Sequence, residues 1–452
     1  MIQRMRSVTE DTSLRSRDPA LSPSTVTDQG RRRLGVPSLG AIVVANMIGA
    51  GVFTTSGFAL ADLGSRGWVM VAWVLGGAVA LLGTLCYGAL AARLKESGGE
   101  YLFLSRTVHP LAGFLAGWIS LWAGFTGAIA LAAEAAGAYL SAWLPDGTPL
   151  DLVGTGAIVA AGVLHTRGAG LGSRVQNLIV ATKILGLLVI IGVGAALLGP
   201  QPASPPASFE LGTFAVTLMW VSLSYSGWNA GVYVAGEARD PARTVPRAMF
   251  GATLAVTALY LALNTVFLYS APIDQLAGQQ DVAAVAAAAL GGPGLEALVR
   301  GVIVLALLTS VSSMVMIGPR VYARMADDGV FPKSLAFTGA VPASAIWLQV
   351  ALSVIVLWAS GLREQLTNLG WILGLSTAFA VVGLLRLRAR EGAERVPIPG
   401  YPLVPFAFLG LVLALTGLAL HTAGRMLLPA LAVLGSGLVV ERLLRIRLLG
   451  DP

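Results

Sequence analysis

The chain has 452 residues, of which 56% are hydrophobic and only 12% are charged, and its mean hydropathy is +0.77. Soluble globular domains are far less apolar, so this composition excludes most soluble enzymes and indicates a membrane protein. The net charge of +7 would suggest nucleic acid as the partner of a soluble protein, but here it reports which loops lie on which side of a bilayer. The single cysteine, Cys86, excludes a disulfide framework and a cysteine-ligated metal site.

Residues 1–33 contain seven arginines and no apolar stretch, which is typical of a disordered tail and not of a cleavable signal peptide. Twelve apolar segments follow, most of them close to the roughly 20 residues that cross a hydrocarbon core. We expect spans at about residues 36–60, 68–92, 110–143, 149–165, 175–199, 211–236, 246–271, 295–324, 342–360, 365–385, 402–421 and 427–444. The apolar run 282–290 is too short to span and predicts a helix in an outer loop, where it would form a lid.

The basic residues divide unevenly between the two sides of this predicted bilayer. With the tail in the cytoplasm, 25 of the 30 basic residues fall on the inner face. The other five are Arg66, Arg300, Arg363 and Arg425 on the outer face and Lys183 within a span. Because inner loops are enriched in Lys and Arg, we expect both termini in the cytoplasm and an even number of spans. Heavy use of Arg, Ala, Gly and Leu is typical of a high-GC bacterial genome, so we expect a multi-pass protein of the bacterial inner membrane.

Two of the predicted spans contain polar, glycine-rich interruptions near their middle. Residues 49–51 of the first span read Gly-Ala-Gly, and residues 222–231 of the sixth include three serines, an asparagine and two glycines. Unwound backbone at membrane depth needs hydrogen-bond partners, which a polar substrate can supply. N–H groups that start a half-helix favour a carboxylate and carbonyl groups that end one favour an ammonium, so two broken helices suit a zwitterion. The alternative is that such glycines are close-packing sites, as in the GxxxG spacing of Gly113 and Gly117.

Short motifs lie at these interruptions and in the loops that follow spans 2 and 6. They are Met47–Phe53, Ser97–Tyr101, Tyr225–Asn229, Gly236-Glu237 and Asp240-Pro241. Together they resemble the amino acid, polyamine and organocation (APC) permease superfamily over residues 34–445. Within that superfamily, Arg174–Asn177 followed by Lys183 in the fifth span is similar to the L-type amino acid transporter branch and its bacterial relatives.

The resemblance implies an all-α membrane fold of the LeuT type with twelve transmembrane helices. Spans 1–5 (residues 34–199) and spans 6–10 (residues 209–388) would form inverted repeats, with spans 1 and 6 broken at mid-membrane. Spans 11 and 12 (residues 402–445) would be appended, and residues 446–452 would form a second cytoplasmic tail.

The same resemblance implies how a substrate is held. Backbone N–H groups of Ala50 and Gly51 would bind its carboxylate, and carbonyl groups of both broken spans would bind its amine. The implied substrate-binding residues are Met47, Ile48, Gly49, Ala50, Gly51, Leu223, Ser226, Gly227 and Asn229. Lys183 matches the lysine that replaces a bound sodium ion in this family, which implies sodium-independent transport. The alternative for Lys183 is a side chain that snorkels to an interface.

Two departures from the family pattern are informative. Many relatives carry an aromatic gate residue in the sixth span where this chain has Leu223, so Tyr225 and Trp220 become the candidates for that gate. The animal L-type branch uses a cysteine between spans 3 and 4 to link a heavy chain, and residues 145–151 contain none. We therefore expect no disulfide-linked heavy chain, and a monomer or a homodimer.

Three further polar residues allow two interpretations each. Glu134 in the third span is either a structural or interfacial group or takes part in proton coupling. Asn229 either binds substrate or satisfies the unwound backbone around it. Glu237 belongs either to a salt-bridge network that closes an inner gate or to an ordinary solvated cluster.

The pattern as a whole predicts an amino acid permease rather than an enzyme. The three histidines lack the HExxH spacing of a zinc protease, and we expect no cofactor, metal or nucleic acid partner. The predicted activity is sodium-independent exchange, uniport or proton symport of a neutral zwitterionic amino acid by alternating access. The alternatives are a polyamine or other organic-cation carrier of the same fold and, less favoured, a membrane sensor that does not transport.

Overall fold

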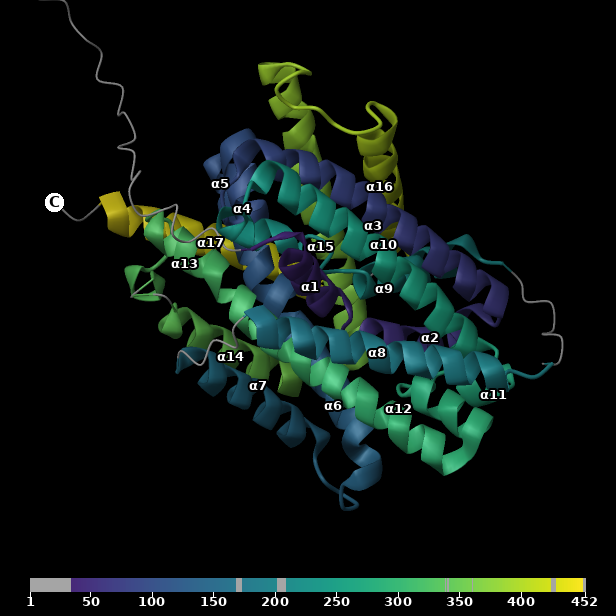
Figure 1. Cartoon of the computed structure of the whole chain (residues 1–452). Helices are drawn as coiled ribbons and strands as arrows, with labels where there is room; N and C mark the ends of the chain where they lie inside the picture. The colour runs from purple at the N-terminus through teal and green to yellow at the C-terminus, as the bar shows by residue number, and fades with distance from the viewer. Residues whose placement is uncertain are drawn as a thin grey trace, which may run out of the picture.

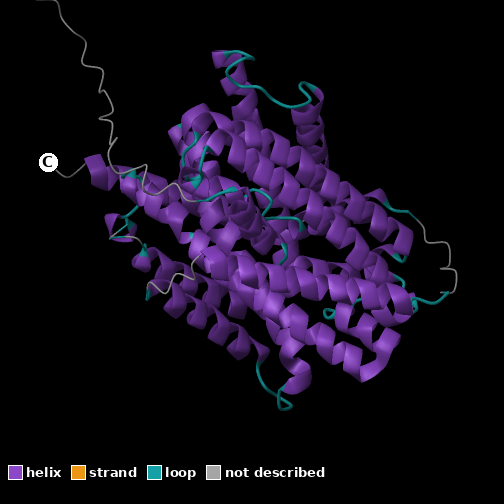
Figure 2. Ribbon diagram, in the orientation of Figure 1, coloured by secondary structure: helices purple, strands orange, loops and turns teal. Residues whose placement is uncertain are grey.

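The structure, a computed structural model, describes residues 34–167, 173–200, 209–337, 339, 341–359, 361–423 and 428–449. The predicted tail of residues 1–33 lies outside these ranges, as do the side chains of the Arg174–Asn177 motif. The described chain is built from helices and contains no β-strand beyond the isolated bridge between Leu34 and Ala238 (Figure 2). Seven helical segments in it are long and apolar enough to cross a membrane, so the chain is a polytopic membrane protein.

The first part of the chain forms eight α-helices and two short helical segments of other types. They are α1 (Val36–Met47), α2 (Gly51–Leu63), α3 (Arg66–Leu94), α4 (Gly99–Thr107), α5 (Pro110–Ile119), the π-helix η1 (Ser120–Gly127), α6 (Ala128–Leu140), the 3₁₀-helix η2 (Ser141–Trp143), α7 (Leu150–Thr166) and α8 (Ser173–Leu197). The short helix α4 was not expected, and two glycines with positive φ lie at its start, Gly98 at 145° and Gly99 at 58°.

The second part begins with a helix that is also interrupted. It comprises α9 (Leu211–Ser224), η3 (Ala230–Glu237), α10 (Pro241–Leu268), α11 (Ile273–Leu276), α12 (Val282–Ile317), α13 (Pro319–Asp327), η4 (Lys333–Leu335), α14 (Ala343–Ala359), α15 (Leu362–Glu391), α16 (Leu403–Ala423) and α17 (Leu428–Leu449). The predicted helix at residues 282–290 is the first part of α12, which kinks at Gly291 and Gly292. The last helix runs to Leu449, beyond the residue 445 at which we expected it to end.

Both predicted interruptions are present, and they pack against each other. Helix α1 ends at Met47 and α2 starts at Gly51, while α9 ends at Ser224 and η3 starts at Ala230. A Cβ atom on Gly51 would lie 2.6 Å from the Cα atom of Ser224. Gly227 has φ +99°, and a Cβ atom there would lie 2.7 Å from the carbonyl carbon of Asn46. Only glycine lets the two unwound backbones approach this closely.

The broken helices lie inside the bundle. Helix α1 lies near its middle in Figure 1 and packs against α8, α10 and α12. Helix α10 packs along α3 over much of its length, and the two run side by side in Figure 1. The unwound segments are therefore enclosed by other helices, so their backbone polar groups need partners from the protein or from a ligand.

Two arginines that the charge pattern assigns to the outer face are buried. Arg66 Nε and Nη2 donate to the carbonyl oxygens of Leu268 (2.7 Å) and Ala271 (2.9 Å), where they cap the end of α10. Arg300 pairs with Asp281 at 2.7 Å and with Glu296 at 2.8 Å. The Arg300 cluster fastens the start of α12 to its continuation beyond the kink.

Replacing Gly51 with alanine should destabilise the fold. The added methyl group would meet the backbone of Ser224, and overpacking of this kind costs about 1–3 kcal/mol. Gly156→Ala is the matched control, because nothing lies within 4 Å of a Cβ atom at Gly156 and alanine favours the helix. Thermal unfolding in detergent should show a lower midpoint for Gly51→Ala only, and equal midpoints for both variants would contradict the tight approach of the two breaks.

Candidate functional site

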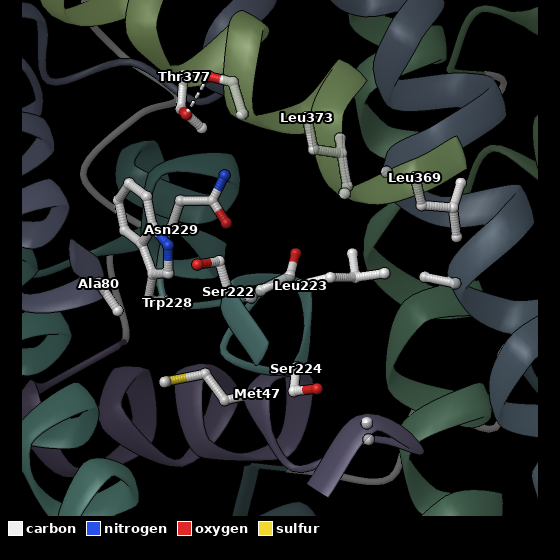
Figure 3. A pocket seen from close by; sticks show the side chains of 18 of the residues that line it. Met47, Ala80, Ser222, Leu223, Ser224, Trp228, Asn229, Leu369, Leu373 and Thr377 are labelled. Atoms are coloured by element: carbon white, nitrogen blue, oxygen red, sulfur yellow. Dashed lines mark hydrogen bonds between the residues drawn. The ribbon is translucent and has the colours of Figure 1, made fainter. Parts of the chain in front are cut away.

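A cavity of about 160 Å³ lies at the two breaks (Figure 3). Its walls also include residues of α3, η1, α6, α12, α15 and α16. Of the substrate-binding residues implied by the sequence, those that line it are Met47, Gly49, Ala50, Gly51, Leu223, Ser226, Gly227 and Asn229. Ile48 does not line the cavity and is buried behind it.

The start of α2 presents free N–H groups at this cavity. In the described part of the chain, the N–H groups of Ala50 and Gly51 donate to no backbone carbonyl. The carbonyl oxygen of Ala50 is already paired, because it accepts from the amide of Phe53 at 3.0 Å and from Oγ1 of Thr54 at 3.1 Å. The positive end of the α2 dipole is therefore available to an anion.

The carbonyl groups at the ends of α1 and α9, in contrast, already accept hydrogen bonds from side chains. The hydroxyl of Tyr260, on α10, lies 2.5 Å from the carbonyl oxygen of Met47 and 3.2 Å from that of Ser224. Lys183 Nζ, on α8, donates to the carbonyl oxygen of Ile48 at 2.5 Å. The Leu223 carbonyl accepts from the amide of Ser226 at 2.8 Å. Tyr260 on α10 thus supplies a donor at the ends of α1 and α9, and Lys183 on α8 supplies one to Ile48, directly after α1.

Lys183 is buried, with 1% of its surface exposed. Its ammonium group points at the first break and not along α8 towards an interface, so the structure does not show the snorkelling alternative. No acidic side chain forms an ion pair with it among the residues that the structure places. The Lys183 amino group therefore stands beside the negative end of α1.

An acidic residue that the sequence analysis gave no role lies at the cavity wall. Glu100, in the first turn of α4, is 3% exposed. Its carboxylate accepts from Nδ2 of Asn229 at 2.5 Å and from the hydroxyl of Tyr233 at 2.5 Å. The cluster connects α4 to η3 and binds the Asn229 amide to the protein. The signal in the sequence was a glutamate directly after two glycines, but it fell outside the predicted spans.

The two aromatic candidates for the gate do not line the cavity. Tyr225 is fully buried, its hydroxyl donates to the carbonyl oxygen of Trp73 at 3.0 Å, and its ring packs 5.0 Å from that of Tyr260. Trp220 is 2% exposed and also lies outside the cavity wall. The aromatic side chains that do line the wall include Phe125 and Trp228.

The two other acidic candidates lie away from the cavity wall. Glu134 is half-buried on α6. Glu237, at the end of η3, pairs with Arg320 at 3.5 Å, and both side chains are partly exposed. Arg324 pairs with Glu96 at 3.4 Å nearby in the chain. The pairs connect η3 and the loop after α3 to α13, as a salt-bridge network would, although exposed pairs of this kind contribute at most about 1 kcal/mol each.

Two serine hydroxyls in the cavity wall have no hydrogen-bond partner among the described residues. They are Ser222 on α9 and Ser310 on α12. A buried hydroxyl without a partner costs about 1–3 kcal/mol, which a ligand can offset. Among the same residues, no group of three His, Cys, Asp or Glu side chains could hold a metal ion. The site thus offers free N–H groups and hydroxyls, which suits a small polar molecule with an anionic group.

Comparison with known proteins agrees with this geometry. Residues 34–433 match the family model described as amino acid permease. The chain is 25% identical to the human Asc-type amino acid transporter 1 over 396 residues, which cover 84% of this chain and 76% of that protein. It is 27% identical to the serine/threonine exchanger SteT of Bacillus subtilis over 391 residues, covering 83% and 88%. It is 25% identical to the human large neutral amino acids transporter small subunit 2 over 400 residues, covering 84% and 74%.

The family model extends from Leu34, two residues before α1, to within α17, so it includes both breaks, Lys183 and the Glu100 cluster. The chain therefore belongs to the amino acid permease family of the APC superfamily.

Proposed function

We propose that this permease exchanges neutral, zwitterionic amino acids across the bacterial inner membrane by alternating access and without sodium. The observation that carries the proposal is a difference between the backbone carbonyl groups and the backbone N–H groups at the first break. The carbonyl groups at Met47 and Ile48 already have fixed donors, whereas the N–H groups of Ala50 and Gly51 are free. The vacant half of the site favours a carboxylate.

The proposed fold is the twelve-span, LeuT-type inverted repeat. Seven long apolar segments, four shorter ones and α17 make twelve among the described residues. The first repeat starts with the α1/α2 break and the second with the α9/η3 break. Each repeat also has a short helix before its third span, α4 in the first and residues 282–290 in the second. These correspondences, and the excess of basic residues in the proposed inner loops, support two inverted repeats with both termini in the cytoplasm.

A neutral side chain on the substrate is favoured over a cationic one. The acidic residue that lines the cavity among the described residues is Glu100, and both of its oxygens already accept from Asn229 and Tyr233. A polyamine or a basic amino acid would need a further carboxylate to balance its second charge. This favours a zwitterion over the organic-cation alternative.

The absence of a sodium requirement follows from the two donors at the first break. A sodium ion would neutralise the negative end of a broken helix by binding its carbonyl oxygens. Lys183 supplies a positive charge to Ile48, and Tyr260 supplies a neutral donor to Met47. Carbonyl groups that already have donors have little to gain from a metal ion.

The proposal has two further parts, which are exchange as the mode of transport and the absence of a disulfide-linked heavy chain. SteT, at 27% identity, is named an exchanger, which favours exchange over uniport or proton symport. The single cysteine, Cys86, is buried in α3, so it is a poor candidate for a disulfide with a second protein. We therefore propose a monomer or homodimer without a disulfide-linked heavy chain.

Purified protein in proteoliposomes should take up labelled neutral amino acids at the same rate with and without sodium. Unlabelled amino acid inside the vesicles should accelerate the uptake, because in exchange the carrier returns loaded with internal amino acid and not empty. Uptake of no amino acid would overturn the assignment of a transport substrate. Uptake that requires sodium would overturn only the proposed role of Lys183 and Tyr260.

Replacing Lys183 with methionine should reduce uptake at least about tenfold, because hydrogen bonds to charged groups contribute about 1.5–3 kcal/mol. The variant keeps an aliphatic chain of similar length but leaves the Ile48 carbonyl without its donor. Thr182→Val is the control, since Thr182 is exposed and its hydroxyl bonds only within α8, to Leu178. Membrane yield and monodispersity should match for both variants, and full activity of Lys183→Met would contradict the proposal.

Replacing Tyr260 with phenylalanine should raise the apparent KM about tenfold, because the single hydroxyl proton that the Met47 and Ser224 carbonyl groups share is lost, and a buried acceptor left without its donor costs about 1–3 kcal/mol. Tyr139→Phe is a matched control. Its hydroxyl is equally buried and donates to the Phe53 carbonyl at 2.7 Å, but that carbonyl lies within α2 and not at a break. Equal changes in KM for both variants would show that Tyr260 acts only through general stability.

A further inference from the structure

The cavity continues past the two breaks into a side compartment. The compartment is bounded by Ala80 of α3, Trp228 of the second break, Gly374 and Thr377 of α15, and Val412 of α16. Figure 3 shows Ala80, Trp228 and Thr377 around one end of the cavity, with Leu369 and Leu373 towards the other. Helix α16 packs against α3, α9 and α15 at this point, so four elements enclose the space.

Close contacts define the walls of this side compartment. The Trp228 ring is held by α3, since a Cβ atom on Gly83 would lie 2.8 Å from it, and its centroid lies 6.4 Å from that of Phe408. On the opposite side, a Cβ atom on Gly374 would lie 3.6 Å from Cγ1 of Val412. The wall on the α3 side is therefore closely packed and aromatic, while Gly374 leaves room for no more than a methyl group in ordinary contact with Val412.

The compartment is mostly apolar. The hydroxyls of Thr377 and Thr416 donate to carbonyl oxygens of their own helices, both at 2.8 Å, so they need no ligand. The hydroxyl of Ser222 has no partner among the described residues and can meet one polar atom of a ligand. Among the side chains that the structure describes, none from α3, α15 or α16 in the cavity wall is charged.

The cavity is larger than the smallest amino acids require. A volume of about 160 Å³ exceeds by an order of magnitude the roughly 10–15 Å³ that a single water molecule needs. Alanine and serine would leave part of it empty, whereas a branched aliphatic or aromatic amino acid would fill it. In Figure 3, Leu369, Leu373 and Thr377 lie across the cavity from Met47 and Ser224. A substrate whose carboxylate meets the start of α2 would direct its side chain towards that opposite wall.

We propose that the side compartment between α3, α15 and α16 binds the distal part of the substrate side chain, and that this permease therefore prefers large neutral amino acids. The inference rests on the proposed function, because it assumes that the charged groups of the substrate bind at the two breaks. The size of the cavity and the absence of charged side chains from the described wall of the compartment select the side chain. The Ser222 hydroxyl adds a place for one polar atom, such as a phenolic oxygen.

The test is to fill the compartment. Gly374→Leu should lower kcat/KM for leucine and phenylalanine about tenfold or more relative to alanine and serine, since one misplaced methylene group costs about 1–3 kcal/mol. Gly410→Leu makes the same exchange on α16, where nothing lies within 4 Å of a Cβ atom, and should leave the ratio unchanged. Gly374→Ala adds only ordinary contacts, with Val412 and Thr416, so it should shift the ratio in the same direction by less, and it serves if Gly374→Leu does not fold.

The outcomes separate the two proposals. A wild-type protein that transports alanine and serine in preference to leucine and phenylalanine would overturn the side-compartment proposal and leave the permease assignment intact. An equal loss for all substrates in both Gly374 variants would also overturn it, because the compartment would then serve the transport path or hold a lipid chain. Absence of transport of every amino acid by the wild type would instead refute the proposed function.

Discussion

The rest of this structure depends on one constraint, which is that unwound backbone inside an apolar bundle must find hydrogen-bond partners. Two helices are interrupted, and each interruption is shaped by the other through Gly51 against Ser224 and Gly227 against Asn46. This contact keeps both sets of orphan N–H and carbonyl groups at one place. An apolar scaffold of helices encloses them, so an unpaired group there costs several kcal/mol. The binding site is a consequence of that unmet requirement.

The side chains that pair with these backbone groups determine which ligand charge the site favours. Side chains from α8 and α10 bond the carbonyl groups that end α1 and α9, and one of these side chains is a lysine. The negative helix ends are therefore compensated from within the protein, while the positive start of α2 is not. An anion gains more at such a site than a cation does. A carboxylate is the anion that an amino acid brings, and the family to which the chain belongs agrees with that.

The sequence predicted the parts of this site that depend on local chemistry. Gly49, Gly51 and the polar run around Asn229 are poor helix formers in otherwise apolar spans, so both breaks could be located. Lys183 could be singled out because an ionisable residue within a span is rare. Tyr260 could not, since a tyrosine in an apolar helix is ordinary until the fold brings its hydroxyl to two carbonyl groups. Glu100 was missed for the same reason, because its partners Asn229 and Tyr233 are distant in the chain.

The same contacts bear on how alternating access could proceed. The end of α1 is joined to α8 through Lys183 and to α10 through Tyr260, so moving α1 alone would break both bonds. Among the described residues, the N–H groups of Ala50 and Gly51 at the start of α2 have no backbone partner, and they are the ones that a carboxylate would bind under the proposed function. A substrate bound there would add a hydrogen bond at the α2 side of the break. Each hydrogen bond contributes about 0.5–3 kcal/mol, which is comparable to the free energies that separate conformations in such equilibria. A substrate bound at α2 can consequently shift the equilibrium between conformations without contacting Lys183 or Tyr260, which hold α1.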